Sequence, residues 1–177
     1  QNWTFNGGLT HGYEPTIGNK DEGSIFIEVG SSEFYNVNYT YNWTKCNQLI
    51  ENSIYNLSAW IYFDTPYEIL GLGTRIGLNW LNSSGETVRL DWSKNINSTL
   101  GGWTNINIMG LYDNESENEI KSLELILSFE GNFSAGVGNK IYFDDVIVDR
   151  WIAVNVTDPF DPKNFLLKLC KIYHFLQ

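Results

Sequence analysis

The chain has 177 residues, of which 42% are hydrophobic and 15% aromatic, and its formal net charge is −10. This length and apolar content allow a single domain with a buried core and exclude an intrinsically disordered chain. A nucleic-acid-binding surface needs clustered Lys and Arg, so the acidic balance argues against nucleic-acid partners. No run of 18 apolar residues occurs, and we therefore expect no transmembrane segment.

Short runs that alternate apolar and polar residues, separated by Gly, Asn, Asp and Ser, recur along the chain. A period of two is typical of β-strands with one buried face. Strands every 8–15 residues, with no helical period between them, predict an all-β, antiparallel sandwich. In chain order, strands are expected at 24–29, 55–63, 74–80, 87–92, 103–109, 122–130 and 141–149.

The final segment, 156–177, breaks this pattern and forms an apolar extension after a sandwich domain at 1–155. Asp161 suits a helix N-cap and Pro162 the first helical position. The apolar residues that follow recur at i, i+3 and i+4, which predicts an amphipathic helix of about 14 residues. A dense apolar run also fits an added edge strand, so both alternatives stay open. The apolar positions are Phe165, Leu166, Leu169, Ile172, Tyr173 and Leu176.

Nine Asn-X-Ser/Thr sequons occur, none with Pro in the middle position. Random placement of the 21 Asn and 24 Ser or Thr would give about three. The excess predicts an N-glycosylated extracellular or cell-surface protein; an Asn-rich composition without such selection is the alternative. The chain begins at Gln rather than Met, which we interpret as a secreted chain whose signal peptide has been removed. The sequons begin at Asn2, Asn38, Asn42, Asn56, Asn82, Asn97, Asn114, Asn132 and Asn155.

The chain has two cysteines, Cys46 and Cys170. In an oxidising compartment they could pair, and the bridge would close a loop of 124 residues. Such a loop closure stabilises a fold by roughly 4–5 kcal/mol on the chain-entropy model. Two free or intermolecular thiols are the other possibility, and the spacing favours neither.

Five short segments stand out by their order and spacing: Asn6–Leu9, Tyr55–Tyr62, Arg75–Trp80, Gly102–Thr104 and Ile141–Val146. Together they resemble the β-jelly-roll carbohydrate-binding modules, with a galactose-binding-like sandwich, that are attached to bacterial and archaeal polysaccharide-degrading enzymes. The resemblance spans residues 5–150, and it implies a jelly-roll fold and a polysaccharide ligand. Because such folds host many functions, it indicates the fold more specifically than the ligand.

The same resemblance implies a structural calcium ion. The family usually opens Asn-Gly-Gly-Phe-Glu, and the acidic residue helps to hold the ion. Here Leu9 and Thr10 stand at that point, so this ligand is missing. Asp144 or Asp145 matches the family's other calcium contact. Because Ca²⁺ takes six to eight oxygen ligands, the resemblance supports only a possible structural Ca²⁺, and no cofactor is otherwise required.

A sugar site needs an aromatic platform with polar groups beside it. By alternation, we expect an aromatic and polar set of this kind on one sheet face, on the side away from the core. Glu124 and Ser128 are expected on the same face as the four predicted sugar-binding residues. The alternative is that the aromatic residues pack beneath a loop or the tail. Trp80 and Trp103 are in phase with apolar neighbours and are expected in the core. The predicted sugar-binding residues are Trp60, Tyr62, Arg75 and Asn79. The sequon at Asn56 would share the face of Trp60, where a glycan would crowd a cleft.

An enzymatic function is not expected. His11 and His174 belong to no nucleophile or metal motif. A glycosidase needs two carboxylates placed about 5–10 Å apart, and the acidic residues of 113–119 look like a solvated loop. The sequence therefore predicts a binding or structural protein.

The leading hypothesis from the sequence is a non-enzymatic, densely N-glycosylated structural protein of an archaeon. It would self-assemble into a surface filament or lattice. The tail, Phe160–Gln177, has a net charge of +2, and the body therefore −12. A basic tail meeting the acidic body of another copy would be complementary, and a heterologous contact that does not close gives a filament. The expected partners are copies of the chain and covalent N-glycans. The alternative is a carbohydrate-binding module that binds polysaccharide.

Overall fold

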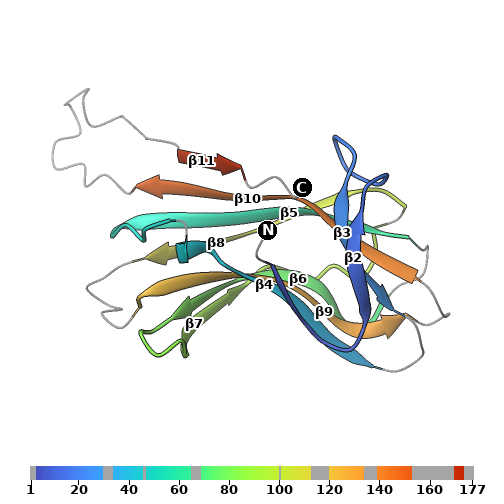
Figure 1. Ribbon diagram of the computed structural model, residues 1–177, viewed down its shortest axis with the longest axis horizontal. Helices are drawn as coiled ribbons and strands as arrows, with labels where there is room; N and C mark the ends of the chain where they lie inside the picture. The colour runs from blue at the N-terminus through green and yellow to red at the C-terminus, as the bar shows by residue number, and fades with distance from the viewer. Residues whose placement is uncertain are drawn as a thin grey trace.

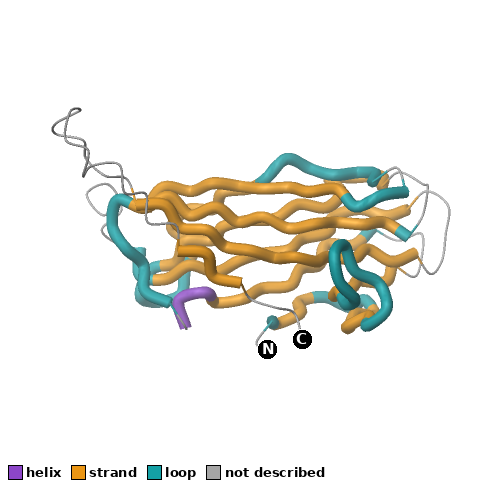
Figure 2. Tube along the Cα trace, turned by 90° about the horizontal axis from the view of Figure 1, so that it is seen from above, coloured by secondary structure: helices purple, strands orange, loops and turns teal. Residues whose placement is uncertain are grey.

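Two antiparallel sheets packed face to face make up the computed structural model (Figure 1), which describes residues 3–29, 34–45, 47–64, 69–99, 101–112, 120–133, 139–152 and 170–173. Sheet A has the strand order β1-β4-β9-β6-β7, and sheet B has the order β2-β3-β10-β5-β8, with β11 added to β10. The predicted all-β jelly-roll sandwich is confirmed. Figure 2 shows that the long strands run along the long axis, with loops gathered at the two ends.

The strand bounds follow the chain order, with one 3-10 turn, η1, after β4. The elements are β1 (Thr4–Asn6), β2 (Thr10–Glu14), β3 (Ser24–Val29), β4 (Tyr35–Asn42), η1 (Trp43–Lys45), β5 (Ser53–Phe63), β6 (Ile69–Leu81), β7 (Thr87–Trp92), β8 (Thr104–Tyr112), β9 (Ser122–Phe133), β10 (Asn139–Ile152) and β11 (Cys170–Tyr173).

Strand β4 is the longest element that the sequence did not predict. Its sequence YNVNYTYN alternates, but every second residue is Asn or Thr. Asn is depleted in strands and is a turn signal, so the alternation of Tyr and Val was hidden. In the fold, Val37 and Tyr39 are buried and the intervening residues point outward, which places a polar row on sheet A.

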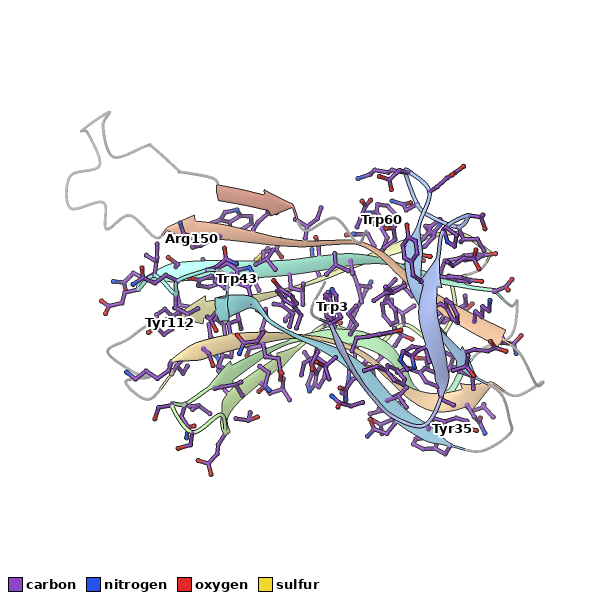
Figure 3. All side chains as sticks on the ribbon, in the orientation of Figure 1. Trp3, Tyr35, Trp43, Trp60, Tyr112 and Arg150 are labelled. Carbon is purple, nitrogen blue, oxygen red and sulfur yellow. The ribbon has the colours of Figure 1, made fainter. Side chains whose placement is uncertain are left out.

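The core lies between the sheets and is filled by the alternate residues of the long strands. In β5, Leu57, Ala59 and Ile61 are fully buried, as the alternation predicted. Trp80 of β6 is also fully buried; its indole Nε1 donates to Asp91 Oδ2 at 2.8 Å, so its polar atom is satisfied. Trp43, at η1, is buried between the two sheets as well (Figure 3).

Strand β10 is the longest of the described strands and has two successive neighbours on one side. Its first part pairs with β3 up to Phe143, and its later part pairs with β11 from Ile147 to Arg150, while β5 runs along the other side. A register shift against β5 separates Asp144 from Ile147, and Asp145 there has φ of 45°. This bulge lies where the neighbour of β10 changes.

The tail contributes a strand where a helix was one of the two expectations. Cys170–Tyr173 pairs antiparallel with β10, in the manner of an added strand. Cys46 and the tail positions Phe165, Leu166 and Leu169 lie outside the described residues, as does Leu176. No helix among the described residues is long and apolar enough to cross a membrane.

Replacing a core residue of β10 tests this packing. We expect Phe143→Ala to lower the free energy of unfolding by about 3–5 kcal/mol, because the buried ring is lost and a cavity remains. Val88→Ala on β7, where the side chain is 40% exposed, is the matched control and should change it by less than about 0.5 kcal/mol. Urea denaturation measures both; equal effects would contradict the assigned core.

Candidate functional site

The four residues predicted for one sugar-binding face lie on two opposite faces of the sandwich. Trp60 and Tyr62 belong to β5 of sheet B, whereas Arg75 and Asn79 belong to β6 of sheet A. All four point away from the core, and Figure 3 shows Trp60 on the outer side of its sheet. Alternation correctly separates inward from outward positions, but it cannot tell which sheet a strand joins. The expectation of one shared face is therefore corrected.

The outer face of sheet A is mostly polar, with Leu90 and Ile126 as apolar members, and the strand register brings its polar groups into rows. Arg75 is directly opposite Ser128, which is opposite Asn38 on the other side, and Asn79 is opposite Glu124. We call this surface the polar face, formed by Asn38 and Thr40 of β4, Glu124, Ser128 and Glu130 of β9, Arg75 and Asn79 of β6, and Trp92 of β7. Figure 1 shows that the strands of sheet A arch, with their ends turned away from sheet B.

Trp92 is the aromatic residue of the polar face. It is the register partner of Gly77, and a Cβ added to Gly77 would lie 2.7 Å from two carbons of its ring. Only glycine leaves room for the indole at this point. The guanidinium carbon of Arg75 lies 4.0 Å from the ring centroid, which is a cation–π contact. The sequence analysis missed Trp92; the signal that could have found it is its phase with Leu90 in the 87–92 strand.

Arg75 and Asn79 are held by acidic neighbours on β9. Arg75 Nη2 lies 3.5 Å from Glu130 Oε2, and these side chains are 20% and 22% exposed. Asn79 Nδ2 donates to Glu124 Oε2 at 3.0 Å. Among the described residues, the Nε of Arg75 and the Oδ1 of Asn79 are buried without a hydrogen-bond partner. Since buried polar groups are nearly always paired, the hydrogen-bonding capacity of the face exceeds what its own side chains satisfy.

The outer face of sheet B has a cluster of aromatic rings that contact one another. The Tyr62 ring lies 5.5 Å from Trp103 and 5.8 Å from Tyr142, between ring centroids. Tyr142 is only 2% exposed, and burial raises its pKa to about 12. Trp103, expected in the core, lies against Tyr62 instead; it precedes β8, so the alternation of that strand does not govern it. Mutual packing uses much of these rings' surface.

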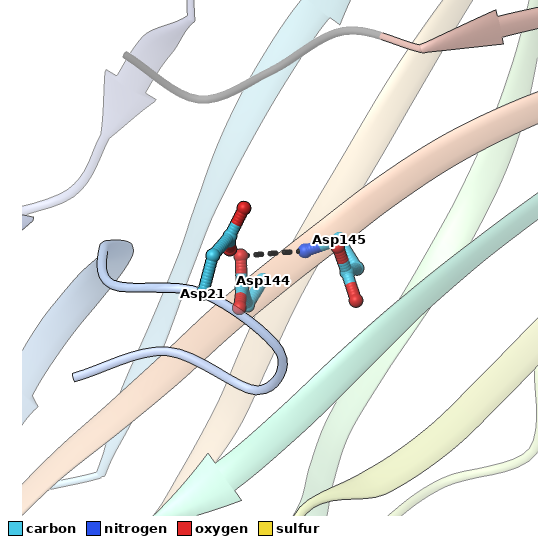
Figure 4. A group of neighbouring side chains, drawn as sticks. All are labelled: Asp21, Asp144 and Asp145. Carbon is cyan, nitrogen blue, oxygen red and sulfur yellow. Dashed lines mark hydrogen bonds between the residues drawn. The ribbon is translucent and has the colours of Figure 1, made fainter.

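Three carboxylates gather where the loop before β3 crosses β10: Asp21, Asp144 and Asp145 (Figure 4). Their oxygens lie within 4.8 Å of one another. Asp144 accepts hydrogen bonds from the backbone N–H of Asn19 at 2.6 Å and of Asp145 at 2.7 Å. Lys20 Nζ lies 3.3 Å from Asp145 Oδ2. Burial, and to a smaller degree the two neighbouring carboxylates, raise the pKa of Asp144.

The cluster fits a divalent cation in ligand type but only partly in number. Carboxylate oxygens are what Ca²⁺ prefers, yet three residues supply fewer than its six to eight ligands. Asp21 adds one ligand to the two that the sequence suggested. Backbone N–H groups and the Lys20 ammonium already balance part of the negative charge, so calcium would have to compete with them.

Calcium should raise the melting temperature if this cluster binds it. Binding to the folded state alone stabilises it by about 2.7 kcal/mol at 100 times the dissociation constant. Without the cation, the raised pKa of Asp144 means that the folded state favours the protonated carboxyl. The contribution of Asp144 to the free energy of unfolding therefore falls as the pH rises from about 3.9, the value in the unfolded chain, through the raised value in the fold. We therefore expect the calcium effect to be larger at neutral than at acidic pH.

Thermal melts with CaCl2 or EDTA measure this effect. Asp21→Asn should abolish the increase, whereas Glu22→Gln, its exposed neighbour, should keep it. An increase that survives Asp21→Asn would place the ion elsewhere, and a melting temperature insensitive to calcium would exclude the ion.

Six of the nine sequons lie within the described residues. Asn38 and Asn42 occupy outward positions of β4, and Asn132 an outward position of β9. Asn56 shares the outer face of sheet B with Trp60, as expected, but it is only 8% exposed. The other two are Asn82, whose side chain organises the β6–β7 turn, and the exposed Asn97; Asn2, Asn114 and Asn155 lie outside.

Burial predicts unequal glycosylation of these sequons. When the chain passes through a glycosylating secretory host, we expect Asn97 to be modified and Asn56 to be unmodified in the folded protein. A glycan on Asn56 Nδ2 would have to displace neighbouring side chains, because so little of this residue is exposed. Mass spectrometry of peptides, with and without glycan removal, measures the occupancy. High occupancy at Asn56 in soluble, folded protein would contradict this expectation.

His11, which belongs to no catalytic motif in the sequence, has a packing role. The His11 ring stacks on Phe5 with a centroid distance of 3.8 Å, and its Nδ1 lies 3.1 Å from the carbonyl oxygen of Leu9. These contacts fix the ring between β1 and β2. His174 lies outside the described residues.

Solved structures of the same architecture include binding modules and enzymes. The CBM22-1 xylan-binding domain of Paenibacillus barcinonensis Xyn10C aligns with a TM-score of 0.56 and 14% identity, over 84% of this chain and 85% of that one. A Stig cyclase from Fischerella sp. TAU aligns with a TM-score of 0.59 and 13% identity, over 84% of this chain and 83% of the cyclase. The enzymatically active domain of bacteriophage CBA120 tailspike protein 4 aligns with a TM-score of 0.59 and 16% identity, over 83% of this chain.

This chain has the jelly-roll fold of the carbohydrate-binding modules. It spans only 19% of the tailspike chain, so only one part of that protein is comparable. At these identities the likeness establishes the fold alone. In sequence, neither a protein-family model nor a curated protein matches.

Proposed function

We propose that this chain is a non-catalytic, extracellular carbohydrate-binding module that binds a polysaccharide across the polar face of sheet A. The observation that supports it most is the combination of Trp92, Arg75 and Asn79 on one outward face, with hydrogen-bonding capacity left over. The xylan-binding domain among the similar structures adds support by analogy of fold.

Each group on the face has a role that suits a sugar. Trp92 offers apolar ring surface for the C–H groups of a pyranose, and Gly77 lets the ring lie close to the sheet. Asn79 and Glu124 pair a donor with an acceptor, and Arg75 adds N–H donors beside Glu130. A small rotation of Arg75 or Asn79 would turn an unpartnered atom toward sugar hydroxyls.

The same contacts favour binding over hydrolysis. Glu124 and Glu130 are engaged by Asn79 and Arg75, which orient both carboxylates as hydrogen-bond acceptors. A glycosidase needs one carboxyl kept protonated as a general acid. The face supports recognition, although enzymes do share this fold.

The polar face is preferred over the aromatic cluster of sheet B. Tyr62, Trp103 and Tyr142 contact one another, and Tyr142 is nearly fully buried. Their packing accounts for these rings without a ligand. Trp60 stays partly exposed, so it provides a matched aromatic residue on the opposite face.

Affinity electrophoresis in gels that contain xylan or other soluble polysaccharides tests the proposal. The protein should come from a host without N-glycosylation, so that no glycan on Asn38 covers the face. We expect retardation, and we expect Trp92→Ala to weaken binding about tenfold or more through loss of ring contact. Arg75→Ala should weaken it as well.

Trp60→Ala is the control and should leave retardation unchanged. If Trp60→Ala abolished retardation while Trp92→Ala did not, the site would be on sheet B. If no polysaccharide retarded the wild-type protein, the carbohydrate-binding function would be excluded for the ligands tested.

A further inference from the structure

The later half of β10 forms a strand-binding edge. β3 pairs with β10 only as far as Phe143, and β5 occupies the other side. From Ile147 to Arg150, the backbone groups on the β3 side are paired by β11. Without β11 this stretch would be an open sheet edge, which is a template for any strand of fitting sequence.

The chain between β10 and β11 is long for a hairpin. Residues 153–169 connect the two strands, which is 17 positions, whereas hairpin loops usually have 2–5. Seventeen residues can span up to about 55 Å. The connection therefore does not require that β11 pairs with its own β10, and exchange between copies would preserve every backbone pair at low cost.

One register pair between β11 and β10 joins residues of opposite charge. Lys171 is the partner of Asp149, and opposite charges directly across an antiparallel pair are stabilising, while like charges are destabilising. Asp149 Oδ1 is buried and accepts no hydrogen bond from the rest of the described chain. A buried carboxylate oxygen of this kind favours a residue of positive charge at the position opposite it in the sheet.

We propose that the β10 edge, Ile147–Arg150, is an acceptor for strand exchange, and that it binds Cys170–Tyr173 of a second copy of this chain. This interaction surface is independent of the polar face. At low concentration the covalent connection favours each chain's own strand, because a short tether gives an effective concentration on the order of millimolar. At higher local concentration the second copy's strand replaces it, and the tail links the copies.

Two reciprocal charge reversals separate exchange from self-pairing. In Asp149→Lys and in Lys171→Asp, the chain's own edge and strand carry like charges. In a mixture of the two variants, every exchanged pair is oppositely charged, whereas every self-pair stays mismatched. The variants are unfolded together and refolded at equal concentration under reducing conditions, so that no disulfide links the copies. One variant is labelled with nitrogen-15.

Native mass spectrometry then measures homodimers, heterodimers and monomers. We expect heterodimers to exceed the homodimers of either variant by roughly tenfold, from two matched pairs per dimer. The double variant Asp149→Lys/Lys171→Asp should behave like the wild type. The control pair Asp64→Lys and Lys94→Asp, at exposed positions away from the edge, should give a random distribution.

Three outcomes would overturn the proposal. They are monomers alone at every concentration, a random mixture of homodimers and heterodimers from the reversed variants, and heterodimers that persist when residues 170–177 are deleted. Circular dichroism of each variant before mixing establishes that it is folded. Retardation by polysaccharide is a separate readout that should be the same for all variants, because Asp149 and Lys171 are not on the polar face.

Discussion

Two long antiparallel pairs, β5 with β10 and β6 with β9, determine the remaining features of the molecule. Each pair gives one set of alternate side chains to the core and the other set to an outer face. The inner sets are almost entirely apolar and make the sandwich. The outer sets are free to differ, and they do: one is mostly polar with the half-buried indole of Trp92, and the other has clustered rings. The chemistry of the two faces thus follows from one packing constraint.

Much of the fold could be predicted from the sequence because alternation records burial directly. It identified seven strands and the inward residues of β5. It could not assign a strand to a sheet, because inward residues of both sheets meet the same core; Arg75 and Trp60 were therefore placed together. It also missed Asp21, which joins Asp144 only when a loop folds across β10. Contacts of that kind depend on tertiary closure and leave no local pattern.

The polar face and the sequons make competing demands on sheet A. Asn38 begins a sequon and is also the register partner of Ser128, which is opposite Arg75. A glycan on Asn38 would lie over the same rows that we propose for a polysaccharide. Dense glycosylation and ligand binding are thus alternative uses of this face. Occupancy of Asn38 decides between them more directly than occupancy of Asn97, which is not part of the polar face.

The acidic cluster and the strand-binding edge are adjacent parts of β10, and this adjacency has a physical consequence. The bulge at Asp145 separates the stretch paired with β3 from the stretch paired with β11. Asn19 reaches both Asp144 and Asp145 from the loop before β3, so the bulge is tied to that loop by hydrogen bonds. Lys20 adds an ion pair with Asp145 to these ties, and a cation held by the three carboxylates would add another. A fixed junction holds the later half of β10 in register for an incoming strand, whichever copy supplies it.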